Sequence, residues 1–138
     1  MTLNGGNIQV RVYYEDTDAG GIVYHASYVR FAERGRTEYL RALGFEQQQL
    51  RGETGLGFAV SKMTIDFKTP ALLDDLLDVR TSIERMGGAS IDFLQKIERN
   101  GETVATLTVR VACLDRRARP ARLPAALRAA FEKGLTAP

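Results

Sequence analysis

Hydrophobic residues first recur at every second position, over residues 8–14. Alternation with a period of two is typical of a half-buried β-strand, so the sequence predicts a strand there that ends at Tyr14. Residues 15–21 are acidic and glycine-rich and predict a loop.

Residues 27–43 carry apolar or small residues at spacings of three and four, which is typical of one face of an α-helix. These positions are Tyr28, Phe31, Ala32, Gly35, Tyr39 and Leu43. Ser27 is expected to cap the start of the helix and Gly44 to end it. Gly35 costs a helix about 1 kcal/mol relative to alanine, which predicts close packing against a sheet at that point.

The second half of the chain predicts strands without another long helix between them. These strands are expected over residues 58–68, 77–85, 89–99 and 103–114. Gly87-Gly88 and Asn100-Gly101 are expected as hairpin turns, the latter because both residues tolerate positive φ. A short turn over residues 47–51 and a terminal helix over residues 125–133, after Pro124, complete the pattern.

One long helix and one sheet bury both of their apolar faces when the sheet curls around the helix. The order of elements therefore predicts an α+β fold in which the last three strands form an antiparallel meander. The length of 138 residues fits a single domain over 1–138 that folds without disulfides or metal. Such a sheet leaves an unpaired edge, which favours oligomerisation.

Composition narrows the functional classes. A net charge of +2 is too small to indicate a nucleic-acid partner. The single cysteine, Cys113, excludes an intrachain disulfide and a cysteine-based zinc site, and we expect it to be buried in a strand. No apolar run approaches the roughly 18 residues of a membrane span, and no signal-peptide pattern opens the chain. We therefore expect a cytoplasmic protein without a transmembrane segment.

Candidate chemistry is concentrated between the first strand and the long helix. This segment holds the only histidine, His25, together with Asp18 and the pair Gly20-Gly21. A helix start offers amide N–H groups and a positive dipole end to an oxyanion, and paired glycines let the backbone approach a ligand. A carboxylate such as Asp18 acts as nucleophile or general base. Together these groups suit acyl transfer to water.

Other metal-binding and catalytic motifs are incomplete or absent in this sequence. Asp16-x-Asp18 resembles the start of a calcium loop, but the twelfth position is Ser27 instead of a bidentate glutamate. No G-x-S-x-G, H-E-x-x-H or phosphate-binding loop occurs, and Ser27 lies too close to His25 in sequence for a serine triad. We expect no metal and no cofactor.

Residues 14–25, followed by the helix over 28–39, resemble the hotdog-fold acyl-CoA thioesterases of the 4-hydroxybenzoyl-CoA thioesterase family. They are most similar to its bacterial branch associated with the Tol–Pal envelope system. Residues 67–71 followed by Asp74-Asp75 also fit the family pattern. The resemblance implies an antiparallel sheet of five or six strands around one central helix. It further implies a homodimer or homotetramer with active sites at subunit interfaces.

The implied reaction is hydrolysis of an acyl-CoA thioester to free acid and CoA, with acyl-carrier protein as another carrier to test. Asp18 falls on the catalytic aspartate of the family. The backbone amides of Tyr24 and His25 fall where the carbonyl is polarised, and the side chains of Tyr14 and His25 are expected to assist. The positions expected to contact substrate are Gly20, Gly21 and Val23.

Each site residue also has a structural alternative. Asp18 would then only cap a turn, His25 would be an ordinary side chain at the helix entry, and Tyr14 would pack in the core. Glu15 and Asp16 are expected to be structural. Basic residues between Arg110 and Lys133 either bind CoA phosphates or form a solvated face.

Two other functions stay open. A module that senses acyl-CoA or acyl-carrier protein would bind without releasing thiol, and it would not need the acid at Asp18. A hydratase or dehydratase would pair His25 with an acid around an α-proton.

Overall fold

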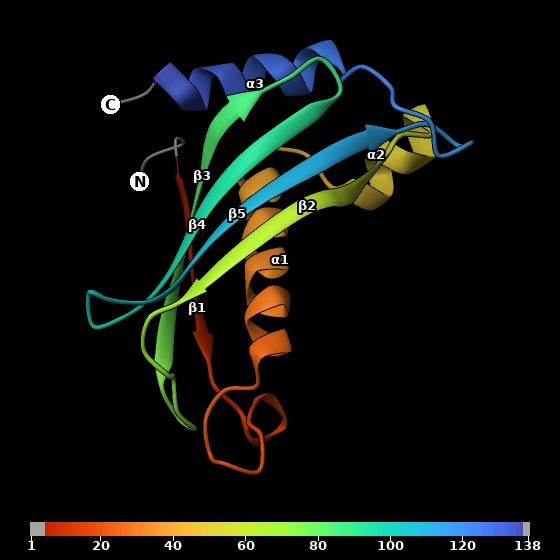
Figure 1. The fold of residues 1–138 in the computed structure, drawn as a ribbon. Coiled ribbons are helices and arrows are strands. Elements are labelled where there is room, and N and C mark those ends of the chain that lie inside the picture. The colour runs from red at the N-terminus through yellow and green to blue at the C-terminus, as the bar shows by residue number, and fades with distance from the viewer. Residues whose placement is uncertain (1–4, 137–138) are drawn as a thin grey trace.

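The computed structural model describes residues 5–136, in which a curved antiparallel sheet wraps around helix α1 (Figure 1). Two further helices flank the sheet, and a 3-10 turn at Tyr14–Asp16 follows the first strand. The elements are β1 (Gly5–Arg11), α1 (His25–Ala42), α2 (Gln47–Thr54), β2 (Gly57–Phe67), β3 (Leu76–Met86), β4 (Ser90–Arg99), β5 (Glu102–Leu114) and α3 (Ala125–Thr136).

The five strands lie in the order β1-β3-β4-β5-β2, and every neighbouring pair is antiparallel. The predicted meander of the last three strands is confirmed. Asn100 and Gly101 have φ values of 51° and 82°, as the hairpin prediction required. The two edges of the sheet are β1 and β2, which are the strands before and after α1 in sequence.

Helix α1 approaches the sheet most closely at Gly35. A Cβ atom built on Gly35 would lie 2.8 Å from Thr81 Oγ1 and 2.9 Å from Val79 Cγ1. Beside it, the fully buried Gln95 donates hydrogen bonds to the Ala32 carbonyl (2.8 Å) and to Thr81 Oγ1 (2.9 Å). The predicted close packing at Gly35 is therefore confirmed, and a polar link reinforces it.

The predicted apolar face of α1 is also confirmed, since Tyr28, Phe31 and Tyr39 are almost fully buried. Helix α3 covers one end of the core, where Phe131 packs near the rings of Tyr39 and Phe93. Cys113 is buried in β5 as expected, and this burial raises the pKa of its thiol. Within residues 5–136, the helices are too short or too polar to span a membrane.

Several predicted boundaries were wrong for local reasons. Helix α1 begins at His25 with Tyr24 as N-cap, whereas Ser27 is buried and donates its hydroxyl to the Asp16 carbonyl (3.2 Å). The first strand stops at Arg11, because Asp16 accepts the Tyr13 N–H (2.8 Å) and turns the chain. Gly44 follows α1 with a φ of 96°, as predicted.

Tyr14 consequently leaves the predicted strand. It belongs to the 3-10 turn and its side chain is 83% exposed, so it does not pack in the core. The short turn expected over residues 47–51 is the helix α2, which reaches Thr54. The terminal helix extends to Thr136 instead of ending at residue 133.

Replacing Gly35 with alanine tests the close approach of α1 to the sheet. We expect Gly35→Ala to lower the free energy of unfolding by about 1–2 kcal/mol, because displacing Thr81 and Val79 outweighs the gain in helix propensity. Denaturant unfolding measures the change. The matched control is Gly52→Ala in α2, where a Cβ meets nothing within 4 Å. Equal effects of the two substitutions would contradict the packing argument.

Candidate functional site

The site lies where α1 begins, and its first component is the turn around Asp18. Asp18 donates its N–H to the Ile22 carbonyl (2.9 Å), and Gly21 donates to the Asp18 carbonyl (3.1 Å). Gly21 has a φ of 82°, a conformation that favours glycine. Gly20 donates its N–H to Asp18 Oδ1 (2.8 Å). The turn therefore fixes one oxygen of the carboxylate.

A second segment, residues 68–75, lies against this turn at the same end of the molecule (Figure 1). Val23 donates its N–H to the Ala71 carbonyl (2.9 Å), and Ile22 forms an isolated bridge with Leu72. From α1, the Tyr28 hydroxyl accepts the Ala71 N–H (3.1 Å). Segments far apart in sequence are thus joined by backbone hydrogen bonds.

Between these segments and the helix start is a cleft of about 380 Å³. Its lining combines the Asp18 carboxylate, the Lys68 cation and several apolar side chains. The lining residues are Asp18, Ile22, Val23, His25, Tyr28, Phe67, Lys68, Thr69 and Pro70. The Phe67 ring packs edge-on against Tyr28, with centroids 5.5 Å apart. Carboxylate, helix start and apolar wall therefore meet in one cleft.

The helix-start amides are not equivalent. The Tyr24 N–H donates to the Asp16 carbonyl (2.8 Å), so this amide already has a backbone acceptor in the single chain. The role of Tyr24 in polarising a substrate carbonyl stays a prediction. His25 is the first residue of α1, and the first N–H groups of a helix have no acceptor within the helix. The positive end of the helix dipole lies at this amide. His25 is exposed, and the centroid of its ring lies 4.3 Å from the centroid of the Tyr24 ring.

Of the other predicted site residues, one lines the cleft and three do not. Val23 is buried and lines the cleft beside Asp18. Gly20 and Gly21 shape the turn but are not among its lining residues. The exposed Tyr14 ring also does not line this cleft, so the chain by itself does not bring Tyr14 together with Asp18.

Sequence reasoning placed residues 67–71 in the family pattern but assigned neither Phe67 nor Lys68 to the cleft. Phe67 is the last residue of β2 and Lys68 follows it, and only the pairing of distant segments places them at the cleft wall. Within the basic stretch from Arg110, several cations have local partners: Arg110 pairs with Asp92 (2.8 Å) and Arg119 with Asp115 (3.5 Å). Local pairing weakens the case for this stretch as a phosphate site.

A second hollow of about 270 Å³ lies further along α1. It is bordered by apolar residues that include Leu40, Phe58 and Val60, with Glu33 and Arg36 at its polar side. Arg36 is about 16 Å along the helix axis from His25, at roughly 1.5 Å per residue. Burial lowers the pKa of Arg36, and Glu33 opposes that shift. This hollow does not contain Asp18 or the helix start.

Comparisons with known proteins identify the family of this chain. Residues 12–131 match the family model of the thioesterase-like superfamily. The chain belongs to the thioesterase-like superfamily. It is 50% identical over 132 residues to the acyl-CoA thioesterase YbgC of Haemophilus influenzae, covering 95% of this chain and 97% of that protein. The acyl-CoA thioester hydrolase YbgC of Escherichia coli is 48% identical over 126 residues, covering 90% and 93%.

Solved structures support the fold. A probable thioesterase from Bartonella henselae is 40% identical, with a TM-score of 0.84 over 87% of this chain and 99% of that chain. A 4-hydroxybenzoyl-CoA thioesterase variant, solved with 4-hydroxybenzoyl-CoA, has a TM-score of 0.88 at 20% identity. The match covers 93% of this chain and 99% of that chain. The latter likeness concerns the fold alone. The predicted α+β hotdog fold is confirmed, with a five-stranded sheet.

No three His, Cys, Asp or Glu side chains converge as metal ligands in the described part of the chain.

Replacing Asp16 separates a structural acid from Asp18. Asp16 is 8% exposed and accepts the Tyr13 N–H, so Asp16→Ala is expected to lower the free energy of unfolding by about 1–2 kcal/mol. Asp16→Asn keeps an acceptor oxygen and is expected to retain most of that stability. Denaturant unfolding measures both, with the exposed Glu15→Ala as control. A fully stable Asp16→Ala would contradict this role.

Proposed function

We propose that this chain is an acyl-CoA thioesterase, which hydrolyses an acyl-CoA thioester to free acid and CoA. The observation that carries the proposal is one cleft in which the Asp18 carboxylate meets the start of α1. Membership of the thioesterase-like superfamily and the 50% identity to a YbgC acyl-CoA thioesterase support the same reaction.

Asp18 would act by one of two routes. As a nucleophile, a carboxylate oxygen attacks the thioester carbonyl carbon, the C–S bond breaks, and the CoA thiolate leaves and takes up a proton. Water then hydrolyses the mixed anhydride. As a general base, Asp18 instead accepts a proton from the water that attacks the carbonyl. In both routes the hydrogen bond from Gly20 orients the carboxylate.

The substrate carbonyl would face the first turn of α1. As the C–O bond becomes an oxyanion, the His25 N–H and the positive end of the helix stabilise the negative charge. The His25 imidazole, exposed at the cleft, would assist by donating a hydrogen bond or moving a proton. Lys68 on the cleft wall offers a cation to the CoA phosphates.

We also infer that a second copy of the chain completes the site. Asp18 and His25 are both exposed in the single chain, whereas an active site that closes around its substrate expels bulk water and strengthens the electrostatic interactions inside. Strand β2 is an unpaired edge, and its apolar side chains Val60 and Phe67 are 47% and 53% exposed. Antiparallel pairing of two β2 edges would join the sheets and cover Phe67, which lines the cleft.

The same proposal includes a cytoplasmic location and a homodimer or homotetramer. The substrate would be presented by CoA or by acyl-carrier protein. These assignments rest on the resemblance of residues 14–25 to the Tol–Pal-associated branch. Thiol release measured over acyl chains of increasing length identifies a thioesterase. A sensing module would instead bind acyl-CoA at equilibrium without releasing thiol, and a hydratase would remove the absorbance of a conjugated enoyl thioester.

Asp18→Asn tests the catalytic assignment. We expect its kcat to fall by about 1,000-fold or more, because the amide can neither attack nor accept a proton at neutral pH. Its folding and acyl-CoA binding are expected to persist, since Asn keeps an oxygen for the Gly20 N–H. Thiol release and equilibrium binding measure the two properties. The matched control is Glu15→Gln, an exposed acid in the preceding turn. An active Asp18→Asn enzyme would refute the assignment.

Sedimentation equilibrium tests the proposed edge pairing. We expect a mass of two or four times the 15.3 kDa chain. Val60→Glu places a charge on the β2 edge and is expected to shift the protein toward monomer and to lower kcat together. Leu76→Glu, an exposed apolar position on β3, serves as control and should keep the assembly. A Val60→Glu protein with unchanged mass would argue against pairing through β2.

A further inference from the structure

We propose that the Arg99–Asp75 ion pair positions the turn that carries Asp18, although neither residue lines the cleft. The inference rests on the proposed thioesterase activity. It assigns both side chains a positioning role, in which they hold residues 70–75 as the support for the Asp18 turn.

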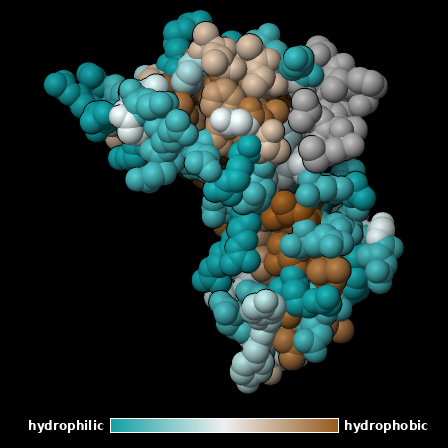
Figure 2. Space-filling view, turned by 180° about the vertical axis from the view of Figure 1, so that it is seen from behind, coloured by the Kyte–Doolittle hydropathy of each residue, from teal (hydrophilic) through white to brown (hydrophobic). Residues whose placement is uncertain are grey.

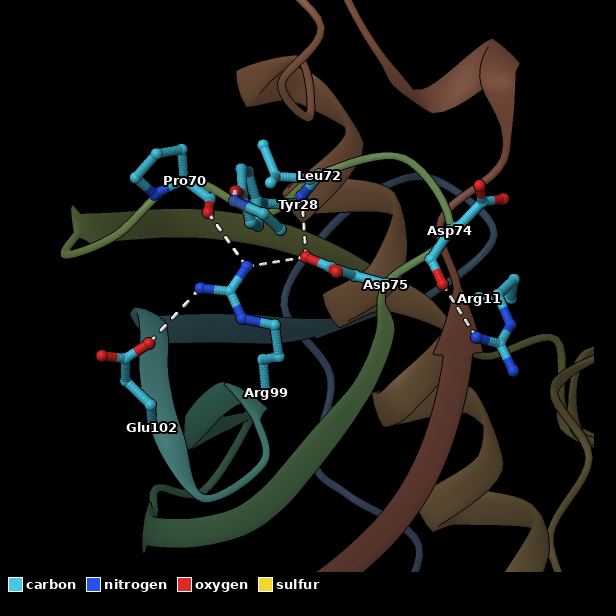
Figure 3. Close-up of polar contacts among 9 residues, drawn as sticks. Arg11, Tyr28, Pro70, Leu72, Asp74, Asp75, Arg99 and Glu102 are labelled. Atoms are coloured by element: carbon cyan, nitrogen blue, oxygen red, sulfur yellow. Dashed lines mark hydrogen bonds and ion pairs between the residues drawn. The ribbon is translucent and has the colours of Figure 1, made fainter.

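Arg99 contacts both ends of the supporting segment (Figure 3). It is the last residue of β4, and its Nη1 donates to Asp75 Oδ2 (2.7 Å) and to the Pro70 carbonyl (3.2 Å). Nη2 donates to Glu102 Oε1 (3.3 Å). The Arg99 and Asp75 side chains are 22% and 21% exposed, so solvent screens this pair less than a surface pair. One guanidinium thereby links Pro70, Asp75 and the β4–β5 turn.

Asp75 closes the segment from the other side. Its Oδ2 also accepts the Leu72 N–H (2.8 Å). Burial raises the pKa of Asp75, but the Leu72 amide and Arg99 together lower it by more, so the carboxyl is ionised at neutral pH. The backbone of Asp75 accepts the Val12 N–H (2.8 Å), and Arg11 donates to the Asp74 carbonyl (2.8 Å). The segment is therefore tied to the end of β1 as well.

Two backbone contacts connect this segment to Asp18. The Ala71 carbonyl accepts the Val23 N–H (2.9 Å), and Leu72 forms the bridge with Ile22. The Ile22 carbonyl in turn accepts the Asp18 N–H (2.9 Å). Movement of residues 70–72 would therefore displace the Asp18 backbone, together with the cleft wall at Pro70.

Arginine suits this role better than lysine. Its planar guanidinium directs donors from two nitrogens toward the Pro70 carbonyl, Asp75 and Glu102. Lysine carries all of its donors on one ammonium nitrogen at the end of a flexible side chain. The pair therefore fixes an orientation more than it adds stability, since half-buried ion pairs offset part of their attraction by desolvation.

The test compares Arg99→Met with Arg110→Met. Arg110 forms a two-bond ion pair with Asp92 (2.8 and 3.1 Å) on the same sheet, away from the cleft. We expect similar losses of stability in both variants, but kcat for an acyl-CoA substrate should fall about tenfold or more only in Arg99→Met, with KM changed by less than about threefold. The kcat of Arg99→Lys should lie between that of Arg99→Met and that of the unchanged protein.

Amide hydrogen exchange gives a readout that does not depend on activity. The amides of Asp18 and Val23 should exchange faster in Arg99→Met, and should keep their protection in Arg110→Met. If the unchanged protein releases no thiol from any acyl-CoA, the proposed function fails, and the exchange data alone decide on the positioning role.

The proposal is overturned if folded Arg99→Met keeps kcat within about twofold of the unchanged protein, or if its exchange at Asp18 and Val23 is normal. Should Arg99→Met fail to fold, Asp75→Asn takes its place under the same criteria, because it removes the charge but keeps an acceptor for the Leu72 N–H.

Discussion

The close contact between α1 and the sheet at Gly35 determines where everything else lies. A side chain at that position would collide with Thr81 and Val79, and the buried Gln95 links helix to sheet through two hydrogen bonds. This contact fixes the helix axis against the concave face, and the first turn of α1 lies at the end of the molecule where β1 ends. The loops that follow β1 and β2 can reach that turn and build a cleft around it.

The cleft is made from loops, but those loops are well supported. Backbone hydrogen bonds join the Asp18 turn to Ala71, and Arg99 of β4 holds the same segment. The sheet and helix form a rigid scaffold, and the short loops on it bring a carboxylate next to amide N–H groups. The polar contacts away from the cleft matter because they set the position of Asp18 within the cleft.

Exposed hydrophobic surface indicates that the single chain lacks a partner that would cover it. Apolar residues reach the surface as a strip in the lower half of the molecule when it is viewed from behind (Figure 2). Several exposed large apolar side chains belong to the cleft end, among them Ile22, Tyr24 and Leu72, and others lie on the β2 edge. Exposed apolar surface next to a cleft is typical of an interface, and it agrees with the proposal that a second copy completes the site.

The sequence by itself determined the order of the strands, the long helix and the terminal helix, because periodicity, glycine turns and the Gly35 packing signal are local properties. It also singled out Asp18 and His25, which lie close in sequence on either side of the turn. Only the tertiary structure decided that Tyr14 faces solvent, that the Tyr24 amide is already bonded to Asp16, and that Lys68 lines the cleft. These outcomes depend on partners brought together by strand pairing, as do the contacts of Arg99 with Pro70 and Asp75, and no local pattern encodes which distant groups will meet.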